Sequence, residues 1–204
     1  MKKVLGTITA VMFTVLTLAS FISPTGKAST YKIDTDKSTV KWTGKKLTSD
    51  HFGSISISEG SFAFDGKAFT AGEVKMDMNS ITVEDIKDKK GQDRLAGHLK
   101  NDDFFATDKF PEAKLVITKS TAGEKGQIVI HGNLTIKEIT KPISFPVTVK
   151  AEGKNAVKAT GTITVDRAKY DIKFRSKSFM DPAALGDKMI SDEFTLDVAI
   201  LATK

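Results

Sequence analysis

The chain has 204 residues, of which 40% are hydrophobic and 27% are charged. This is ordinary globular composition, and the length suits one domain or at most two small ones. The absence of cysteine excludes a thiol enzyme, a disulfide oxidoreductase and a cysteine-anchored lipoprotein. The formal net charge is +6, but the lysines are dispersed and aromatic stacking groups are few, so we expect no nucleic-acid partner.

The start of the chain has the pattern of a secretory signal peptide, residues 1–28. Two lysines precede an apolar run, and Gly26 and Ala28 place small residues at positions −3 and −1 of a cleavage point after Ala28. Threonines and a proline argue against a retained anchor, which needs roughly 18 consecutive apolar residues. We therefore expect a periplasmic or secreted mature domain, residues 29–204, with no stable membrane insertion. Cleavage removes three lysines and no acid, so the net charge falls from +6 to +3.

From Tyr31 onward, apolar and polar residues alternate with the two-residue period of half-buried strands. Turn signals such as Asp65-Gly66 separate the strands at hairpin spacing, and connections this short make neighbouring strands antiparallel. The pattern predicts about eight strands, near residues 31–43, 55–64, 74–83, 115–117, 128–136, 143–149, 157–165 and 194–200.

Strands with one apolar face must close around a core. A β-sandwich and a barrel both satisfy this requirement, and we favour a barrel, because a lumen of about eight strands can be filled by side chains or hold one small ligand. Pro142 and Pro146, four residues apart, remove hydrogen-bond donors from the same side of one strand. We predict weak strand pairing along that side.

Two segments do not follow the strand pattern, residues 84–105 and 167–192. In the first, Leu95 and Leu99 share one helical face. Long structured connections in a compact domain are usually functional, so both are predicted to be lids. The apolar side chains of the first are expected to plug or line one end of the barrel: Leu95, Leu99, Phe104 and Phe105.

No pattern in the sequence predicts a metal, a cofactor or a catalytic residue. His51, His98 and His131 are far apart and form no ligand-spaced pair. Asp102 and Asp103 are interpreted as caps of a following helical turn in preference to an acid–base pair. With Arg94 and His98 they are expected to fix the shape of the insert by pairing and capping. Thirteen phenylalanines and six methionines suit adaptable apolar walls, but composition alone is equally compatible with a filled core and a lipid-filled lumen.

Residues 92–105, QDRLAGHLKNDDFF, with Lys109-Phe110-Pro111 after them, resemble the signature of the YceI-like family of polyisoprenoid-binding, lipocalin-like proteins. Lys137-Glu138 stands where that family usually has a glycine. The resemblance spans residues 30–202. Further matches to the family occur in the expected order, at residues 31–34, 38–42, 132–136, 139–143 and 186–193.

The resemblance implies an all-β, extended eight-stranded antiparallel lipocalin-like barrel with a short helical insert between strands 3 and 4. It implies an isoprenoid lipid ligand, polyprenyl or quinone-like, held in the lumen without established catalysis. Candidate ligand-binding residues follow from strand phase and side-chain size: Trp42, Phe62, Phe64, Met76, Met78, Leu115, Ile117, Ile130, Leu134, Phe145, Val147, Phe174, Phe179, Met189 and Phe194.

Two alternatives remain open at the level of sequence. One is an exported structural or protein-binding barrel with a filled core. The other is an enzyme that uses Arg94, His98 and Asp102 or Asp103 on a lipid head group. The sequence does not decide the oligomeric state, and a homodimer is compatible with it.

Overall fold

Ten strands form one antiparallel sheet in this computed structural model, which describes residues 27–204. The predicted signal peptide therefore lies outside the described residues, apart from its last two. The strands are β1 (Ser29–Ile33), β2 (Thr39–Lys46), β3 (Asp50–Ser54), β4 (Ser56–Phe64), β5 (Phe69–Asp77), β6 (Glu112–Ala122), β7 (Ile128–Ile136), β8 (Ile139–Glu152), β9 (Ala156–Asp166) and β10 (Ile190–Thr203).

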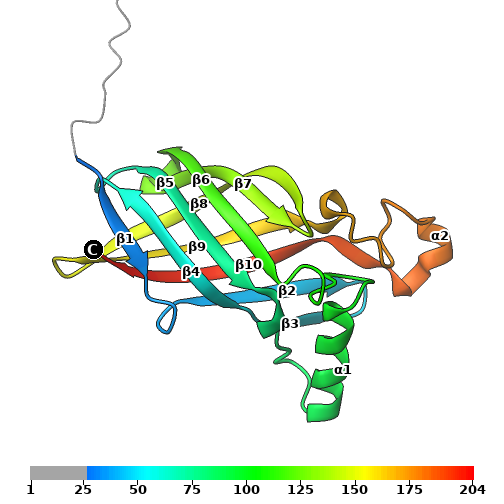
Figure 1. Cartoon of the computed structure of the whole chain (residues 1–204). Coiled ribbons are helices and arrows are strands. Elements are labelled where there is room, and N and C mark those ends of the chain that lie inside the picture. The colour runs from blue at the N-terminus through cyan, green and yellow to red at the C-terminus, as the bar shows by residue number, and fades with distance from the viewer. Residues whose placement is uncertain (1–26) are drawn as a thin grey trace, which may run out of the picture.

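The sheet closes on itself (Figure 1). Strand order runs β1-β4-β5-β6-β7-β8-β9-β10, and β1 pairs with β10 to complete an eight-membered ring. β10 pairs with β1 near its C-terminal end and with β2 along the rest of its length. β2 in turn pairs with β3, which directly precedes β4 in the chain. The predicted all-β, closed, eight-stranded antiparallel barrel is confirmed at this level.

The predicted position of the helical insert, between strands 3 and 4, is not confirmed. The helix α1 (Lys89–Lys100) follows β5, because the first predicted strand is divided into β1 and β2 and because β3 was not predicted. The side chain of Asp34 accepts a hydrogen bond from the Lys37 amide at 3.1 Å and forms the turn that ends β1. β3 and β4 are separated at Ile55, whose amide donates to Val40 at 3.0 Å.

A second helix, α2 (Pro182–Leu185), was not predicted. It begins at the cap Asp181, whose carboxylate accepts from the Ala183 amide at 3.0 Å. Short 3₁₀ turns complete the helical content: η1 (Met78–Ser80), η2 (Glu124–Gly126), η3 (Arg167–Tyr170) and η4 (Gly186–Lys188). Among residues 27–204, no helix is both long enough and apolar enough to span a bilayer.

The two ends of the barrel differ (Figure 1). At one end the strands are joined by the short β4–β5, β6–β7 and β8–β9 turns, and the C-terminus lies there. The other end carries the β2–β3 hairpin and the two long connections, between β5 and β6 and between β9 and β10. We call these the closed end and the open end.

Aromatic side chains fill the closed end. Tyr31, Phe62, Phe64 and Phe69 are all buried. The rings of Phe64 and Phe69 lie 4.7 Å apart and those of Phe62 and Phe69 lie 5.1 Å apart, within the range for favourable aromatic pairs. Hydrophobic packing therefore seals this end of the lumen.

The pairing between β8 and β9 covers only part of both strands. It runs from Thr148–Thr160 to Glu152–Ala156, next to the turn, and stops before the half of β8 that contains Pro142 and Pro146. Both prolines still lie in register with β7. Because a strand residue points its nitrogen and its carbonyl to the same neighbour, these prolines offer β9 no donor.

Candidate functional site

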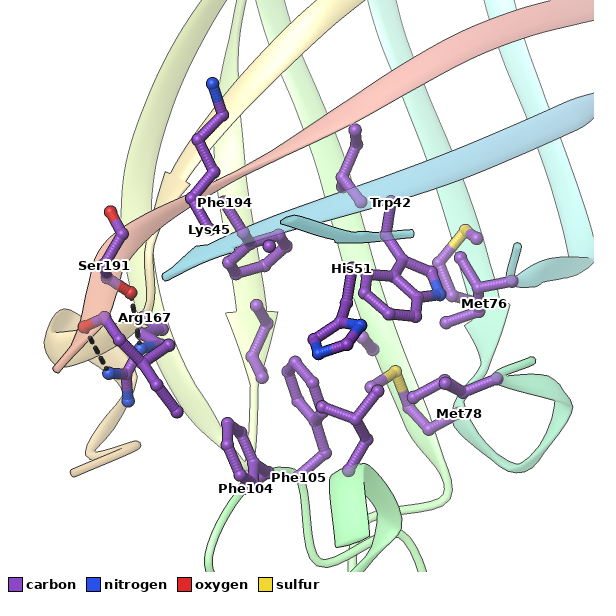
Figure 2. Close-up of a pocket in the computed structure, with 18 of the residues that line it drawn as sticks. Trp42, Lys45, His51, Met76, Met78, Phe104, Phe105, Arg167, Ser191 and Phe194 are labelled. Atoms are coloured by element: carbon purple, nitrogen blue, oxygen red, sulfur yellow. Dashed lines mark hydrogen bonds between the residues drawn. The ribbon is translucent and has the colours of Figure 1, made fainter. Parts of the chain in front are cut away.

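An apolar cavity of about 170 Å³ lies inside the open end of the barrel. Figure 2 shows side chains from the barrel strands, the helical insert and the start of β10 converging on it. We call it the mouth cavity. Its lining includes Trp42, Met76, Met78, Leu95, Leu99, Phe104, Phe105, Leu134, Ile136, Phe194 and Leu196, with Lys45, Lys46, His51, Arg167 and Ser191 at its polar edge.

A second apolar cavity, of about 120 Å³, lies deeper, and Phe62 and Phe69 of the sealed end contribute to its wall. We call it the inner cavity. Each volume is similar to that of an apolar cavity of about 150 Å³ that admits a benzene-sized molecule. The two cavities share Met76, Leu134 and Leu196, so these three side chains form a partition between them.

Most of the predicted wall residues line these cavities, and their contact with a ligand stays a prediction. Most of them lie on strands whose sequence alternates between apolar and polar residues, so the inward phase could be assigned from sequence. Trp42, Met78 and Phe194 line the mouth cavity, Met76 and Leu134 line both, and Phe62, Leu115, Ile117, Ile130, Phe145 and Val147 line the inner cavity.

Four of the predicted wall residues line neither cavity. Phe64 faces inward but lies beyond the inner cavity, in the aromatic cluster of the closed end. Phe174 and Phe179 border a separate, open groove on the surface, and Phe179 is 46% exposed. Met189 is half-buried and borders no cavity. The last three lie in the irregular 171–189 connection, where strand phase predicts no direction.

Sequence reasoning missed Arg167, which is 4% exposed at the edge of the mouth cavity. Its guanidinium donates from Nε to the Ser191 carbonyl at 2.9 Å, from Nη1 to Ile172 at 2.9 Å and from Nη2 to Ile190 at 3.1 Å. Burial lowers the pKa of Arg167, while the charges of Asp192 and Asp166 oppose that shift. Arg167 thus fastens both ends of the β9–β10 connection to the barrel.

Asp192 supplies the countercharge. One of its oxygens lies 3.6 Å from Arg167 Nη2, and the other accepts from the Ser178 hydroxyl at 2.7 Å. Desolvation raises the pKa of this carboxyl, but hydrogen bonds from Ser176 and Ser178 and the charge of Arg167 outweigh it, so the pKa is lowered. The pair is separated by 25 residues in sequence and carries no local motif, so it could not be predicted.

A second polar pair lies beside the mouth cavity. His51 Nδ1 and Asp85 Oδ2 share a hydrogen bond of 2.8 Å, and the Phe52 amide donates to the other oxygen of Asp85 at 3.0 Å. Burial alone raises the pKa of Asp85, but these hydrogen bonds more than reverse that effect and lower it. The Trp42 indole donates to the Thr82 carbonyl at 3.0 Å. Among the described residues, no cluster of histidine and acidic side chains is placed to hold a metal ion.

The comparison with known proteins agrees with this geometry. The sequence profile described as the YceI-like domain matches residues 31–202. The chain belongs to the YceI-like family.

Curated relatives of this YceI-like protein include proteins of Shewanella species. A UPF0312 protein of Shewanella denitrificans is 28% identical over 179 residues, which is 84% of this chain and 90% of the relative. Another from Shewanella sp. strain ANA-3 is 31% identical over 119 residues, 56% of this chain and 60% of the relative. The chain therefore spans less than two thirds of that second relative.

Solved structures share the fold. BcnA of Burkholderia cenocepacia superposes with a TM-score of 0.67 at 20% identity, covering 84% of this chain and 99% of BcnA. A polyisoprenoid-binding domain from Saccharophagus degradans, implicated in plant cell wall breakdown, gives a TM-score of 0.59 at 14% identity and covers 85% and 97% of the two chains.

In this YceI-like protein, the signature stretch lies at the open end of the barrel and forms part of the cavity wall there. Leu95 and Leu99 of α1, with Phe104 and Phe105 after it, line the mouth cavity as expected from their pattern. The His98 ring packs edge-on against Phe104 at 5.0 Å between centroids. The stretch is thus part of the cavity wall.

The acidic pair in the signature does not cap a helical turn, so the capping interpretation was wrong, whereas the expected pairing is present. Asp102 forms an ion pair with Lys109 at 2.8 Å, and Asp103 shares a hydrogen bond of 3.0 Å with His98. The cap is Asn101, whose side-chain oxygen accepts from the Asp103 amide at 2.9 Å. The carboxylates instead fix the chain after α1 by pairing.

Proposed function

We propose that the protein binds the isoprenoid chain of a polyprenyl or quinone-like lipid in its two cavities and carries or sequesters it without chemical conversion. The observation that supports this most directly is the arrangement of the cavities in series, with Met76, Leu134 and Leu196 between them. A sealed aromatic end and an accessible mouth suit a chain that enters at one end only.

The physical driving force is the removal of hydrocarbon from water. Burial is worth about 0.8 kcal/mol for each CH₂ group, and β-barrel mouths are common places for such ligands. The partition contains Met76, whose unbranched, polarizable side chain changes shape at low cost. A rotation of Met76 would join the cavities, so a chain longer than the mouth cavity can be held.

Binding without catalysis is supported by the engagement of the polar groups around the mouth. Arg167 donates to three main-chain carbonyls, the Trp42 indole donates to a fourth, and His51 is held by Asp85. We further propose that the protein is exported and acts in the periplasm or after secretion, on the strength of the signal pattern in residues 1–28.

The single tryptophan makes a direct test possible, because Trp42 lines the mouth cavity. Geraniol, farnesol and geranylgeraniol are titrated against the purified protein while Trp42 fluorescence is recorded. We expect saturable changes with affinity that increases with chain length, and weaker binding of straight-chain alcohols of equal carbon number. Native mass spectrometry with organic extraction of protein from its own host gives an independent readout. An apo mass combined with no response to any prenyl alcohol would favour the filled-core barrel instead.

A further inference from the structure

Four large apolar side chains stand out on the surface of the described residues. Leu47 is 66% exposed, Phe52 44%, Phe179 46% and Met180 49%. Leu47 and Phe52 belong to the β2–β3 hairpin, and Phe179 and Met180 to the 171–189 connection. Both segments lie at the open end of the barrel (Figure 1). Exposed apolar groups gathered in this way are typical of an interaction surface.

Backbone contacts place the two segments side by side. The Ile190 amide donates to the Arg175 carbonyl at 3.0 Å, and Ile190 is also the register partner of Lys46. Leu47 follows Lys46 directly, so the hairpin tip and the 171–189 connection flank the same residue. Because Lys46 and Ile190 line the mouth cavity, the exposed apolar groups border its entrance.

Basic side chains accompany these apolar groups. The run from Lys173 to Met180 holds three cations and no acid, and Lys45 and Lys46 lie on the hairpin. Lys173 pairs with Asp171 at 2.8 Å. For Lys45, Lys46, Arg175 and Lys177, no carboxylate of the described residues lies within ion-pair distance. Cations that form no direct ion pair, interspersed with exposed Leu, Phe and Met, are typical of protein surfaces that lie at a lipid–water interface.

We propose that the open end docks on an anionic phospholipid bilayer, with the β2–β3 hairpin and the 171–189 connection in contact with the lipid. The apolar side chains enter the head-group region while the cations contact the phosphates. This orientation presents the mouth cavity to the membrane, so a chain can pass into the barrel without crossing water. That benefit rests on the proposed function, whereas the docking itself rests on the surface alone.

The test is co-sedimentation of the purified protein with vesicles. We expect binding to vesicles of equal parts phosphatidylglycerol and phosphatidylcholine, much less to phosphatidylcholine alone, and a marked loss at 500 mM NaCl because salt screens the attraction. Equal binding to both kinds of vesicle, or none to either, would overturn the proposal.

Two double variants locate the contact. Lys177→Gln with Lys188→Gln removes two exposed charges of the 171–189 connection that line neither cavity, and the matched control, Lys125→Gln with Lys154→Gln, removes two exposed charges at the closed end. We expect roughly a tenfold loss of partitioning for the first, since each basic residue near an anionic surface contributes severalfold, and little change for the control. Equal losses would mean that net charge alone drives binding, and would refute docking by the open end.

Phe179→Ser with Met180→Ser tests the apolar contribution. We expect severalfold weaker binding that 500 mM NaCl reduces further, with an unchanged unfolding temperature because both side chains are exposed. Unaltered vesicle binding would count against the apolar contact. Titration of farnesol without vesicles separates the two proposals. A variant that no longer binds vesicles but still binds farnesol supports docking. If the parent protein binds vesicles but no prenyl alcohol, docking stands and the proposed function fails.

Discussion

Phenylalanine side chains have different roles at the two ends of the barrel. At the closed end, Phe62, Phe64 and Phe69 are buried against one another and Tyr31. At the open end, Phe105 lines a cavity, and Phe179 is exposed. The difference follows from the connections: short turns let strands converge on a packed core, whereas two long connections leave room for a cavity and a surface. An aromatic residue near the short turns therefore packs in the core, whereas one near the long connections lines a cavity or is exposed at the surface.

Truncation should affect the two ends very unequally. Phe69→Ala is expected to lower the free energy of unfolding by about 3–5 kcal/mol, because it leaves a cavity in a packed aromatic cluster. Phe179→Ala is expected to change it by no more than about 0.5 kcal/mol, since the ring is half exposed. Chemical denaturation followed by circular dichroism measures both. Similar losses would mean that the open end is as rigidly packed as the closed end.

The buried ion pair at the open end should limit stability in acid. The pKa of Asp192 is lowered in the folded protein, so its contribution is present above the unfolded value of about 3.9 and is lost as the pH falls through the folded pKa. Asp192→Asn should be less stable than the parent at pH 7 and should lose less stability on acidification below about pH 4. The control is Asp108→Asn, which changes an exposed carboxylate. If Asp192→Asn and the parent protein lost the same stability on acidification, the lowered pKa assigned to Asp192 would be contradicted.

The partition between the cavities should set the preferred chain length. Leu134→Phe places more volume between them, at a cost of about 1–3 kcal/mol in stability. The ratio of affinities for geranylgeraniol and geraniol is expected to fall about tenfold, because the longer chain loses the inner cavity while the shorter one does not need it. Leu201→Phe, which changes a residue that lines neither cavity, should leave this ratio unchanged.

The sequence predicted inward-facing residues well wherever strands alternate, because strand phase is a local property. It did not predict depth along the barrel, which is why Phe64 was assigned to the ligand wall when it lies in the closed-end cluster. It also failed in the 171–189 connection, where Phe174, Phe179 and Met189 follow no period. The turn at Asp34 divides the first predicted strand, and β3 lies before the second, so the predicted position of the helix within the strand order is not confirmed. Pairs distant in the chain, such as His51 with Asp85, left no local signal.

The partly paired β8–β9 junction extends the comparison to the backbone. Pairing is complete next to the turn at the closed end and absent from Gly161 to Asp166, toward the open end. A Cβ on Gly161 would lie 2.6 Å from the Pro146 carbonyl, so this proline directs its donor-free nitrogen at β9. Amides of residues 161–166 that face β8 should therefore exchange with solvent faster than those that face β10.

Hydrogen exchange measured by NMR gives this comparison residue by residue, since unpaired amides open at little free-energy cost. Pro146→Val restores a donor and is expected to change global stability by no more than about 1 kcal/mol, while it slows exchange at the facing amides of β9. Val149→Ala, in the paired half of β8, is the comparison variant and should not slow exchange there. Uniformly slow exchange along both halves of the parent junction would show that the prolines do not weaken it, and the open end would then differ from the closed end in its connections alone.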